Sequence, residues 1–466
     1  MTDNSLIRAA RDAWMGGDEF RRKRDRYKKY TYGQQWCDDV PDGTGRMCKE
    51  EEVLYLAGKQ PYSNNLIRHL VKTIVGRFRQ LATERGYYSR AADSIDRQCQ
   101  LAELDARLLE EFLISGMAVQ RVDVKGSGRG RKVTVENVDS RRFFVNDVRD
   151  PRGYDVEFVG QCRDMSLPEV LSRFGHGDLR RIVRLQGIYR GGRRNAGYSS
   201  YTSLGEPDDI EFYQAAPGKC RVIELWTLDA DQRLMCSDPD SGAVYYRPLS
   251  EADDIMQANE LRRARGRQPI ETAADIDFRW NCRWLAPTGE LLDCEPSAQP
   301  DGRHPYVIRM YPLTDGEIHP FVEDIIDQQR LINRLIMMID KMMASSAKGV
   351  LLFPLTQLPD DISMGDVCQT WARADGVIPI TGRGNDLPQQ VVTSTHDVGA
   401  YQLLELQMRL FDNISGVGGV LQGRTVTGNT GADAYDRQIE SATIALSDLL
   451  ETFAALISER TLRLRR

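Results

Sequence analysis

The sequence predicts an α+β fold, in which a mixed body is followed by two long helices with a small α/β insert between them. Three observations predict it. After Met117, apolar and polar side chains alternate as they do in half-exposed strands. The stretch from Pro320 to Ala347 has no internal Gly or Pro, and a second apolar repeat of helical spacing begins near Asp397. We therefore expect one elongated subunit with a strand-rich part and a helical part.

The length and charge of the chain limit its class. At 466 residues it exceeds what one hydrophobic core usually organises, so several structural units or one elongated subunit are expected. Apolar residues make up 41% and charged residues 28%, which is ordinary for a folded chain. Because the formal net charge is -6, the chain as a whole lacks the basic footprint of a tight duplex-DNA binder.

The cysteines and histidines do not form a metal-binding pattern. The 9 cysteines are spread along the chain without a C-x-x-C pair, and only 5 histidines accompany them. We expect no metal site and no cofactor, and free thiols in a reducing compartment rather than disulfides. We also expect no signal peptide and no membrane segment, because the N-terminus lacks an apolar core and the apolar runs are short.

An early basic cluster leaves two interpretations open. The segment FRRKRDRYKKY, from Phe20 to Tyr30, holds seven basic side chains against one Asp. One interpretation is that these side chains contact phosphates. The other is that they form the solvated face of a helix whose opposite side buries Phe20, Tyr27 and Tyr30.

The first part of the body is predicted to be mainly helical. Residues 37–60 are expected to form largely a loop. Apolar residues at intervals of four from Leu66 to Phe78, behind a cap at Ser63 or Asn64, predict a helix. A further helix is expected over about 95–115.

Strands dominate the rest of the body. AVQRVDVKGSGRGRKVTVENV predicts a strand, a glycine-rich turn and a strand, and no G-x-x-x-x-G-K-[ST] phosphate loop occurs in the chain. A helix is predicted to begin at Ser166, with Pro168 and Glu169 in its first turn. CRVIELWTL and FRWNCRWL predict further strands on either side of a charged helical insert near 250–268.

The first long helix is the most distinctive feature of the sequence. At roughly 1.5 Å per residue, a helix from Pro320 to Ala347 would be about 42 Å long. One apolar stripe is marked by Val322, Ile325, Ile332, Ile336, Ile339 and Met343. The run from Leu335 to Ile339 is apolar all round the helix, so it must be covered on every side, by its own core or by neighbouring subunits.

A compact insert separates this helix from its successor. GVLLFP predicts a short strand ended by Pro354, DDISMGDVCQTWARADG a small helix, and VIPITG another strand. The second long helix begins at His396 or Asp397, with an apolar side formed by Val398, Tyr401, Leu404, Met408, Phe411 and Ile414. After glycines that break this helix, LQGRTVTGNTG predicts an exposed loop. A last amphipathic helix uses Tyr435, Ile439, Ala442, Leu446, Leu449, Phe453 and Leu456.

The order of these parts resembles that of the portal proteins of tailed bacteriophages. The segments that carry the resemblance are FRRKRDRYKKYTYGQQW with its Gly-x-Gln-Trp ending, FLISGMAVQRVDV, SRRFFVNDVRDPRGYDVEFVGQCRDMSLPEVLSRFG, VEDIIDQQRLINRLI with its Asp-x-Gln-Arg-x-x-Asn pattern, and GGVLQGRTVTGNTGADAYDRQ. The likeness extends over most of the chain and is one of order and style. The final helical region is short for the crown of a portal protein.

This resemblance implies an elongated subunit with named parts. They are a wing at 1–319, a first stem helix at 320–348, a clip at 349–392, a second stem helix at 393–416, a tunnel-loop region at 417–432 and a short helical crown at 433–466. The implied assembly is a ring, usually dodecameric, at one capsid vertex of the virion. Double-stranded DNA would be packaged and ejected through its channel, and assembly would take place in the host cytoplasm.

The resemblance also implies roles for particular residues. The tunnel loop would touch DNA weakly and without reading bases through Arg424, Thr425, Thr427 and Asn429. The stem would pack against its neighbours through Leu335, Ile336 and Ile339. The clip would bind partners through Leu352, Phe353 and Trp371. Those partners would be the terminase large subunit and later the head-to-tail adaptor, with major capsid and scaffolding proteins as further partners.

Two other classes were weighed against this one. A motor enzyme would need a phosphate-cradling loop, and the sequence has none. A metal nuclease would need a cluster of metal ligands. Glu323, Asp324 and Asp327 need not form one, because acidic side chains are favoured at the positive end of a helix without any metal. We therefore expect no enzyme. The second alternative is a structural adaptor of a phage particle that assembles without forming a channel, which a closed dimer would favour.

Overall fold

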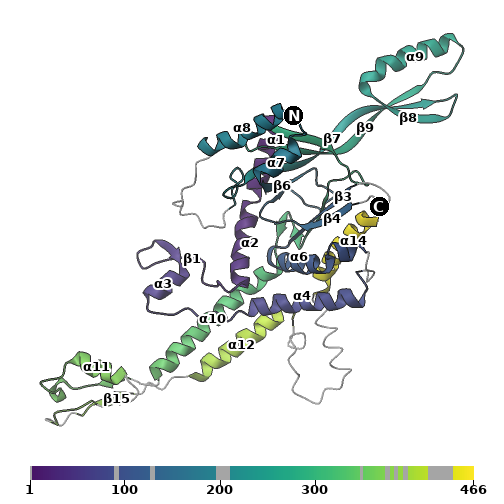
Figure 1. Ribbon diagram of the computed structural model, residues 1–466. Coiled ribbons are helices and arrows are strands. Elements are labelled where there is room, and N and C mark those ends of the chain that lie inside the picture. The colour runs from purple at the N-terminus through teal and green to yellow at the C-terminus, as the bar shows by residue number, and fades with distance from the viewer. Residues whose placement is uncertain are drawn as a thin grey trace, which may run out of the picture.

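The computed structural model describes residues 3–88, 94–125, 132–195, 210–346, 350–372, 378–382, 387–391, 397–417, 444 and 446–465. Figure 1 shows a mixed body from which two parts extend in opposite directions. One is a slender arm made by β7, β8, β9 and α9, at the upper right. The other is the pair α10 and α12, which leads to a small unit with α11 and β15 at the lower left. Helices and sheets are mixed throughout the body, which confirms the α+β class.

The body begins with helices. Its helices are α1 (Asp3–Gly16), α2 (Asp18–Thr31), α3 (Glu50–Leu56), α4 (Leu66–Glu84), α5 (Ile95–Gln98), α6 (Leu101–Ser115), α7 (Leu167–Phe174) and α8 (Leu179–Asn195). A capping box between Ser166 and Glu169 begins α7, as the sequence predicts. Helix α4 is capped by Asn65, whose side chain accepts the N–H of Arg68, and not by Ser63 or Asn64.

Two sheets form the rest of the body. Their strands are β3 (Met117–Lys125), β4 (Lys132–Asn137), β5 (Phe143–Val145), β6 (Phe158–Met165), β7 (Cys220–Asp238), β8 (Ala243–Pro248), β9 (Glu271–Leu285), β10 (Leu291–Pro296) and β11 (Tyr306–Met310). The larger sheet has the order β10-β9-β7-β6-β5, with β8 paired to β7, and the smaller has the order β11-β3-β4. All of these pairs are antiparallel. The short hairpins β1 (Asp39–Pro41) with β2 (Met47–Lys49), and β12 (Leu313–Thr314) with β13 (Glu317–Ile318), lie outside them.

The helical half contains α9 (Ala252–Ala264) in the arm, then α10 (Phe321–Ser346), β14 (Val350–Leu352), α11 (Met364–Ala372), β15 (Gln389–Val391), α12 (Asp397–Ser415) and α14 (Ser447–Arg465). The long helix, the insert, the returning helix and the terminal helix thus follow the predicted order.

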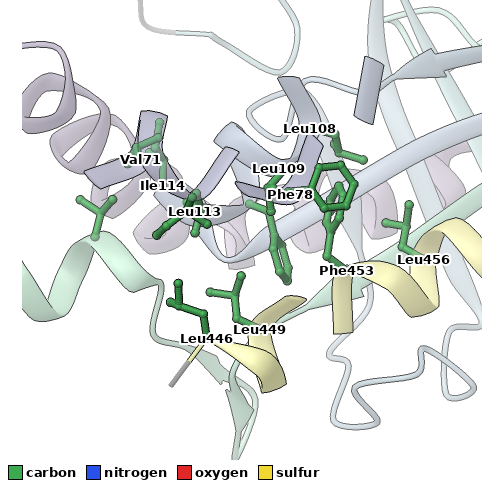
Figure 2. Close-up of a cluster of buried hydrophobic side chains, with 14 of the residues drawn as sticks. Val71, Phe78, Leu108, Leu109, Leu113, Ile114, Leu446, Leu449, Phe453 and Leu456 are labelled. Atoms are coloured by element: carbon green, nitrogen blue, oxygen red, sulfur yellow. The ribbon is translucent and has the colours of Figure 1, made fainter. Parts of the chain in front are cut away.

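One hydrophobic core joins the two halves of the chain. It contains side chains of α2, α4, α6, β3 and β11 from the body together with those of α10, α12 and α14. Figure 2 shows Phe78 and Leu109 facing Leu449 and Phe453 across this core. The rings of Phe78 and Phe453 meet edge to face at 5.3 Å between centroids. The last helix therefore packs into the body, next to the elements that begin the chain.

Three sequence expectations were wrong in detail. Residues 37–60 form a hairpin, β1 with β2, and the helix α3, where a loop was expected. The helix expected over 95–115 is interrupted at Gln100, whose φ of 50° is left-handed. VIPITG was expected to form a strand, but the strand that pairs with β14 is β15, while the N–H of Thr381 binds the carbonyl of Gln357.

A buried histidine lies where α14 meets the larger sheet. The ring of His304 contacts that of Trp280 at 4.6 Å between centroids, and its Nδ1 accepts the N–H of Tyr306 at 3.2 Å. Its carbonyl accepts a hydrogen bond from Arg463 of α14 at 2.8 Å. Burial, with Arg463 and Arg303 nearby, lowers the pKa of His304 to about 3. The folded protein therefore holds this imidazole neutral.

This burial predicts a loss of stability in mild acid. The folded pKa of His304 lies below the ordinary value of 6.5, so the unfolded chain takes up the proton first as the pH falls. Between pH 7 and pH 5 we expect His304 to remove roughly 2 kcal/mol from the free energy of unfolding, measured by urea titration. In His304→Gln this part of the pH dependence should vanish, and in the exposed control His69→Gln it should remain. An equal slope in all three proteins would contradict the assignment.

Candidate functional site

The two long helices form a pair that extends from the body. Helices α10 and α12 lie side by side over much of their length (Figure 1). They run in opposite directions, because the hydroxyl of Tyr401, near the start of α12, contacts the sulfur of Met343, near the end of α10, at 3.2 Å. This antiparallel arrangement lets the chain leave the body along one helix and return along the other.

One apolar stripe of the pair is used within the chain. The first half of α10 places Val322, Ile325, Ile326 and Ile332 in the core of the body. Further out, Leu335 and Ile339 are buried within the single chain, being only 4% and 8% exposed, and Ile336 is partly buried. The residues expected at the contact between subunits thus lie largely inside one subunit.

A second apolar stripe has no cover in the described part of the chain. On α12, Leu403, Leu406 and Ile414 are 41%, 50% and 46% exposed. On α10, Leu331 and Met338 are 40% and 46% exposed. The apolar side predicted from the sequence includes Ile414 and leaves out Leu403 and Leu406. The inner side of α12 is formed by Leu404, Met408 and Phe411, which pack against the core.

A buried polar network fixes α10 to the body. Gln329, Asn333 and Gln35 are 0%, 1% and 1% exposed. Gln329 donates to the carbonyl of Asn64 at 2.7 Å and accepts the N–H of Ile67 at 3.3 Å, at the start of α4. Asn333 donates to the side chain of Gln35 at 2.6 Å. The Gly-x-Gln-Trp and Asp-x-Gln-Arg-x-x-Asn segments are therefore in direct contact.

Charged groups surround this network. Arg334 and Arg330 bind the buried carboxylate of Glu50 at 2.5 and 3.3 Å. On the other side Asp38 accepts hydrogen bonds from Arg26 and Tyr30, both at 2.7 Å. Although burial opposes it, these hydrogen bonds hold the pKa of Asp38 below its ordinary value. Asp38 and Glu50 hold the guanidinium groups of α2 and α10 against the body.

The early basic cluster is used for folding. Five of its members make ion pairs within the chain, and these members are Arg21, Arg22, Lys23, Arg24 and Arg26. Tyr27 and Tyr30 are buried as the second interpretation requires, and Phe20 packs against the larger sheet's core. The burial of Tyr27 and Tyr30 agrees with the helix-face interpretation, but Arg21 and Arg24 are themselves buried, so this face is only partly solvated.

The insert at the far end of the helix pair presents apolar side chains. Leu352 is 53% exposed and Leu355 is 72% exposed, whereas Phe353 and Trp371 are half-buried. The expected partner-binding residues Leu352 and Phe353 thus lie at the end of β14, and Trp371 lies on α11.

The expected DNA-contacting residues Arg424, Thr425, Thr427 and Asn429 lie outside the described residues. The positions that flank them on both sides are well defined by their packing. Phe411 and Val417 before the segment, and Leu446 and Leu449 after it, are buried in the same hydrophobic core. The same core therefore holds the last described residues before the segment and the start of α14 after it.

The acidic start of α10 is not arranged as a metal site. Glu323 accepts the hydroxyl of Tyr27 at 2.7 Å. Burial and the neighbouring Glu323 raise the pKa of Asp324. Among the described residues no group of three or more His, Cys, Asp and Glu side chains could hold a metal ion. Within the same residues, no helix is long and apolar enough to cross a membrane.

Comparison with protein families gives a match over nearly the whole chain. A family model described as phage P22-like portal protein matches residues 7–460 of the 466. No curated protein matches the chain. The match includes the body, the helix pair, the insert and most of the terminal helix.

The polar network predicts a specific loss of stability. Gln329→Leu removes partners from the Asn64 carbonyl, the Ile67 N–H and Asn333, and each buried unsatisfied group costs about 1–3 kcal/mol. We expect the free energy of unfolding to fall by roughly 2–4 kcal/mol in urea titrations. The control Gln80→Leu, at an exposed position of α4, should change it by less than about 0.5 kcal/mol. Equal effects of the two substitutions would count against the network.

Proposed function

The chain belongs to the phage P22-like portal protein family, and from this premise we propose that it forms a ring-shaped channel at one capsid vertex. Double-stranded DNA enters the capsid through this channel during packaging and leaves through it during ejection. The portal family is structural and not a family of enzymes. Its members belong to an oligomeric assembly at the capsid vertex of the virion.

The observation that carries the ring proposal is the second apolar stripe of the helix pair. Leu403, Leu406 and Met338 are each more than two-fifths exposed on an extended element that has no other cover within the described residues. Contiguous exposed apolar surface of this kind marks a protein interface. In a ring, each helix pair has a neighbour on both sides, which supplies the missing cover. We expected the stem contact at Leu335, Ile336 and Ile339. We propose instead that the second apolar stripe makes this contact, and that these three residues support it from inside the subunit.

The charge of the chain suits a channel through which DNA moves. Gripping many phosphates would give tight, salt-dependent binding and would arrest a sliding duplex. A ring of subunits with a net charge of -6 each would hold DNA only weakly. We assign the weak contacts to Arg424, Thr425, Thr427 and Asn429, as polar groups that touch the backbone without reading bases.

The small insert is proposed as the clip, which meets the machinery outside the capsid. Its exposed Leu352, with Phe353 and Trp371 beside it, would dock the terminase large subunit and later the head-to-tail adaptor. Major capsid and scaffolding proteins would contact other parts of the ring. Assembly would take place in the host cytoplasm, before the ring joins the virion.

The alternative is an adaptor that assembles without a channel. The native mass of the purified protein, with particle images of the same sample, separates the two. A closed ring near twelve times 52.8 kDa with a central hole supports the portal proposal, and a closed dimer supports the adaptor.

A substitution on the second apolar stripe tests the ring contact. Leu406→Asp should weaken association by roughly a hundredfold or more, because an unpaired carboxylate is costly to bury. Its circular dichroism should stay near wild type, since Leu406 is 50% exposed in one subunit. The control Leu56→Asp, at an 84% exposed position of α3, should still assemble. Ile339→Asp should also lower stability, because Ile339 is buried within the chain. Rings of unchanged mass in Leu406→Asp would refute the contact.

A deletion tests the DNA-contacting loop. Removal of 424–429 should leave the ring intact, because it spares Phe411 and Val417 before the segment and Leu446 and Leu449 after it, which are anchored in the core. Particles made with this variant should hold less DNA than wild-type particles, measured as packaged genome per capsid. Full particle yield with normal DNA content would contradict the assignment of the loop.

A further inference from the structure

The extension made by β7, β8, β9 and α9 leaves much of its apolar surface exposed. Residues 228–280, here called the arm, comprise the distal halves of β7 and β9 with β8 and α9, and they extend away from the body (Figure 1). Its own buried cluster contains only Leu234, Cys236 and Ile255, with a few partly buried neighbours. A ribbon of so few strands and so small a core is marginal without further packing. The proposed stem and clip contacts do not involve this part of the chain.

The strand register separates the arm into two sides. Along β9, alternate residues point to opposite sides of the sheet. Ala274, Ile276, Phe278 and Trp280 share one side with Leu234 and Cys236, and this side is here called the α9 side because Ile255 of α9 packs on it. Ala273, Asp275 and Asp277 share the other, open side with Met235 and its β8 partner Tyr246.

The α9 side has an apolar gap. At its base Trp280 is buried in the core of the body, and at its tip Ile255 covers Leu234 and Cys236. Between these two clusters Ile276 and Phe278 are 52% and 63% exposed. An aromatic and a β-branched side chain next to each other on an uncovered sheet face form an apolar docking surface.

The open side has a different apolar patch with a charged border. Val244 and Tyr246 of β8 are 58% and 50% exposed. The guanidinium of Arg233 lies 4.0 Å from the centre of the Tyr246 ring and binds Asp275 at 2.7 Å and Asp277 at 2.9 Å. The two ion pairs fix the guanidinium of Arg233, and the guanidinium in turn holds the Tyr246 ring in place. The ring is therefore a rigid, flat contact surface.

Charges on the arm complement each other between copies. Arg263, Arg265 and Arg267, at and after the end of α9, are exposed and make no ion pair within the described residues. On the open side Asp231 and Glu271 are exposed and likewise without an ion pair among those residues. Glu271, like Arg263, Arg265 and Arg267, lies at the distal end of the arm, so an arm that places its α9 side on the open side of another arm brings these opposite charges near each other.

We propose that the arms of adjacent subunits stack on one another, with Ile276 and Phe278 of one copy packed against Val244 and Tyr246 of the next. The proposal rests on the ring proposed above. Head-to-tail association requires two different patches on opposite sides of one element, whereas a two-fold contact uses the same patch twice. The arm has such a pair of patches. A capsid or scaffold partner would cover one side and leave the other exposed.

Cross-linking distinguishes these arrangements. The parent is Cys294→Ser/Cys368→Ser, which removes the two exposed cysteines. In this parent, Val244→Cys/Phe278→Cys treated with a short bis-maleimide should give a ladder of dimers and higher species on denaturing gels. Neither Val244→Cys nor Phe278→Cys alone should give more cross-linked species than the parent. Cross-linking of a single variant into dimers would show a two-fold contact and would overturn the proposal, and so would the absence of a ladder.

A second variant keeps the test independent of the introduced thiols. In rings of Ile276→Ser/Phe278→Ser, protease should cut the arm about tenfold faster than in wild-type rings. Tenfold is the factor that 1.4 kcal/mol of lost contact gives. The matched control Leu56→Ser should match wild type. Native mass separates the two proposals: rings without a ladder refute arm stacking and leave the portal ring standing, and a monomer without a ladder refutes both.

Discussion

The buried amide network between α10 and the start of α4 is the interaction on which the arrangement of the chain depends. Apolar contacts are non-directional and would tolerate a helix turned or shifted along the body. Gln329 and Asn333 do not tolerate it, because their partners are backbone groups near α4 and the side chain of Gln35, all at fixed positions. Everything distal to the network, namely the helix pair and the insert, takes its direction from this junction.

The two apolar sides of the helix pair differ in what they contact: one packs within the chain and the other is left for a neighbouring subunit. Leu335, Ile339 and Phe411 are buried within the chain and hold the pair together. Leu403, Leu406 and Met338 remain exposed, although their side chains are of the same kind. A helix apolar on all sides is unfavourable in a monomer and favourable in an assembly, because only a neighbour can cover the remaining side. The sequence feature that singled out α10 therefore has its explanation partly inside the subunit and partly between subunits.

The order of elements and the bounds of the long helices were predictable from local signals, such as the absence of Gly and Pro between Pro320 and Ser346 and the capping box at Ser166. The contact between Gln35 and Asn333 was not, because a pairing across nearly three hundred positions has no periodic signature. The distinction between inner and outer apolar residues on α12 was missed for the same reason, since it depends on where α10 lies. Most partners of the basic cluster, such as Asp18 and Glu19, are close in sequence, whereas Glu111, which binds the buried Arg24, is 87 positions away and has no local signal.

The last helix is fixed to the body by a buried ion pair as well as by its apolar side. Asp105 of α6 and Arg460 of α14 form an ion pair that is almost fully buried, and Gln120 binds both. Breaking such a pair is costly, so α14 is held to the body by more than its apolar side. Phe411 near the end of α12 and Leu449 near the start of α14 are buried in the same core, so both helices are fixed to the body.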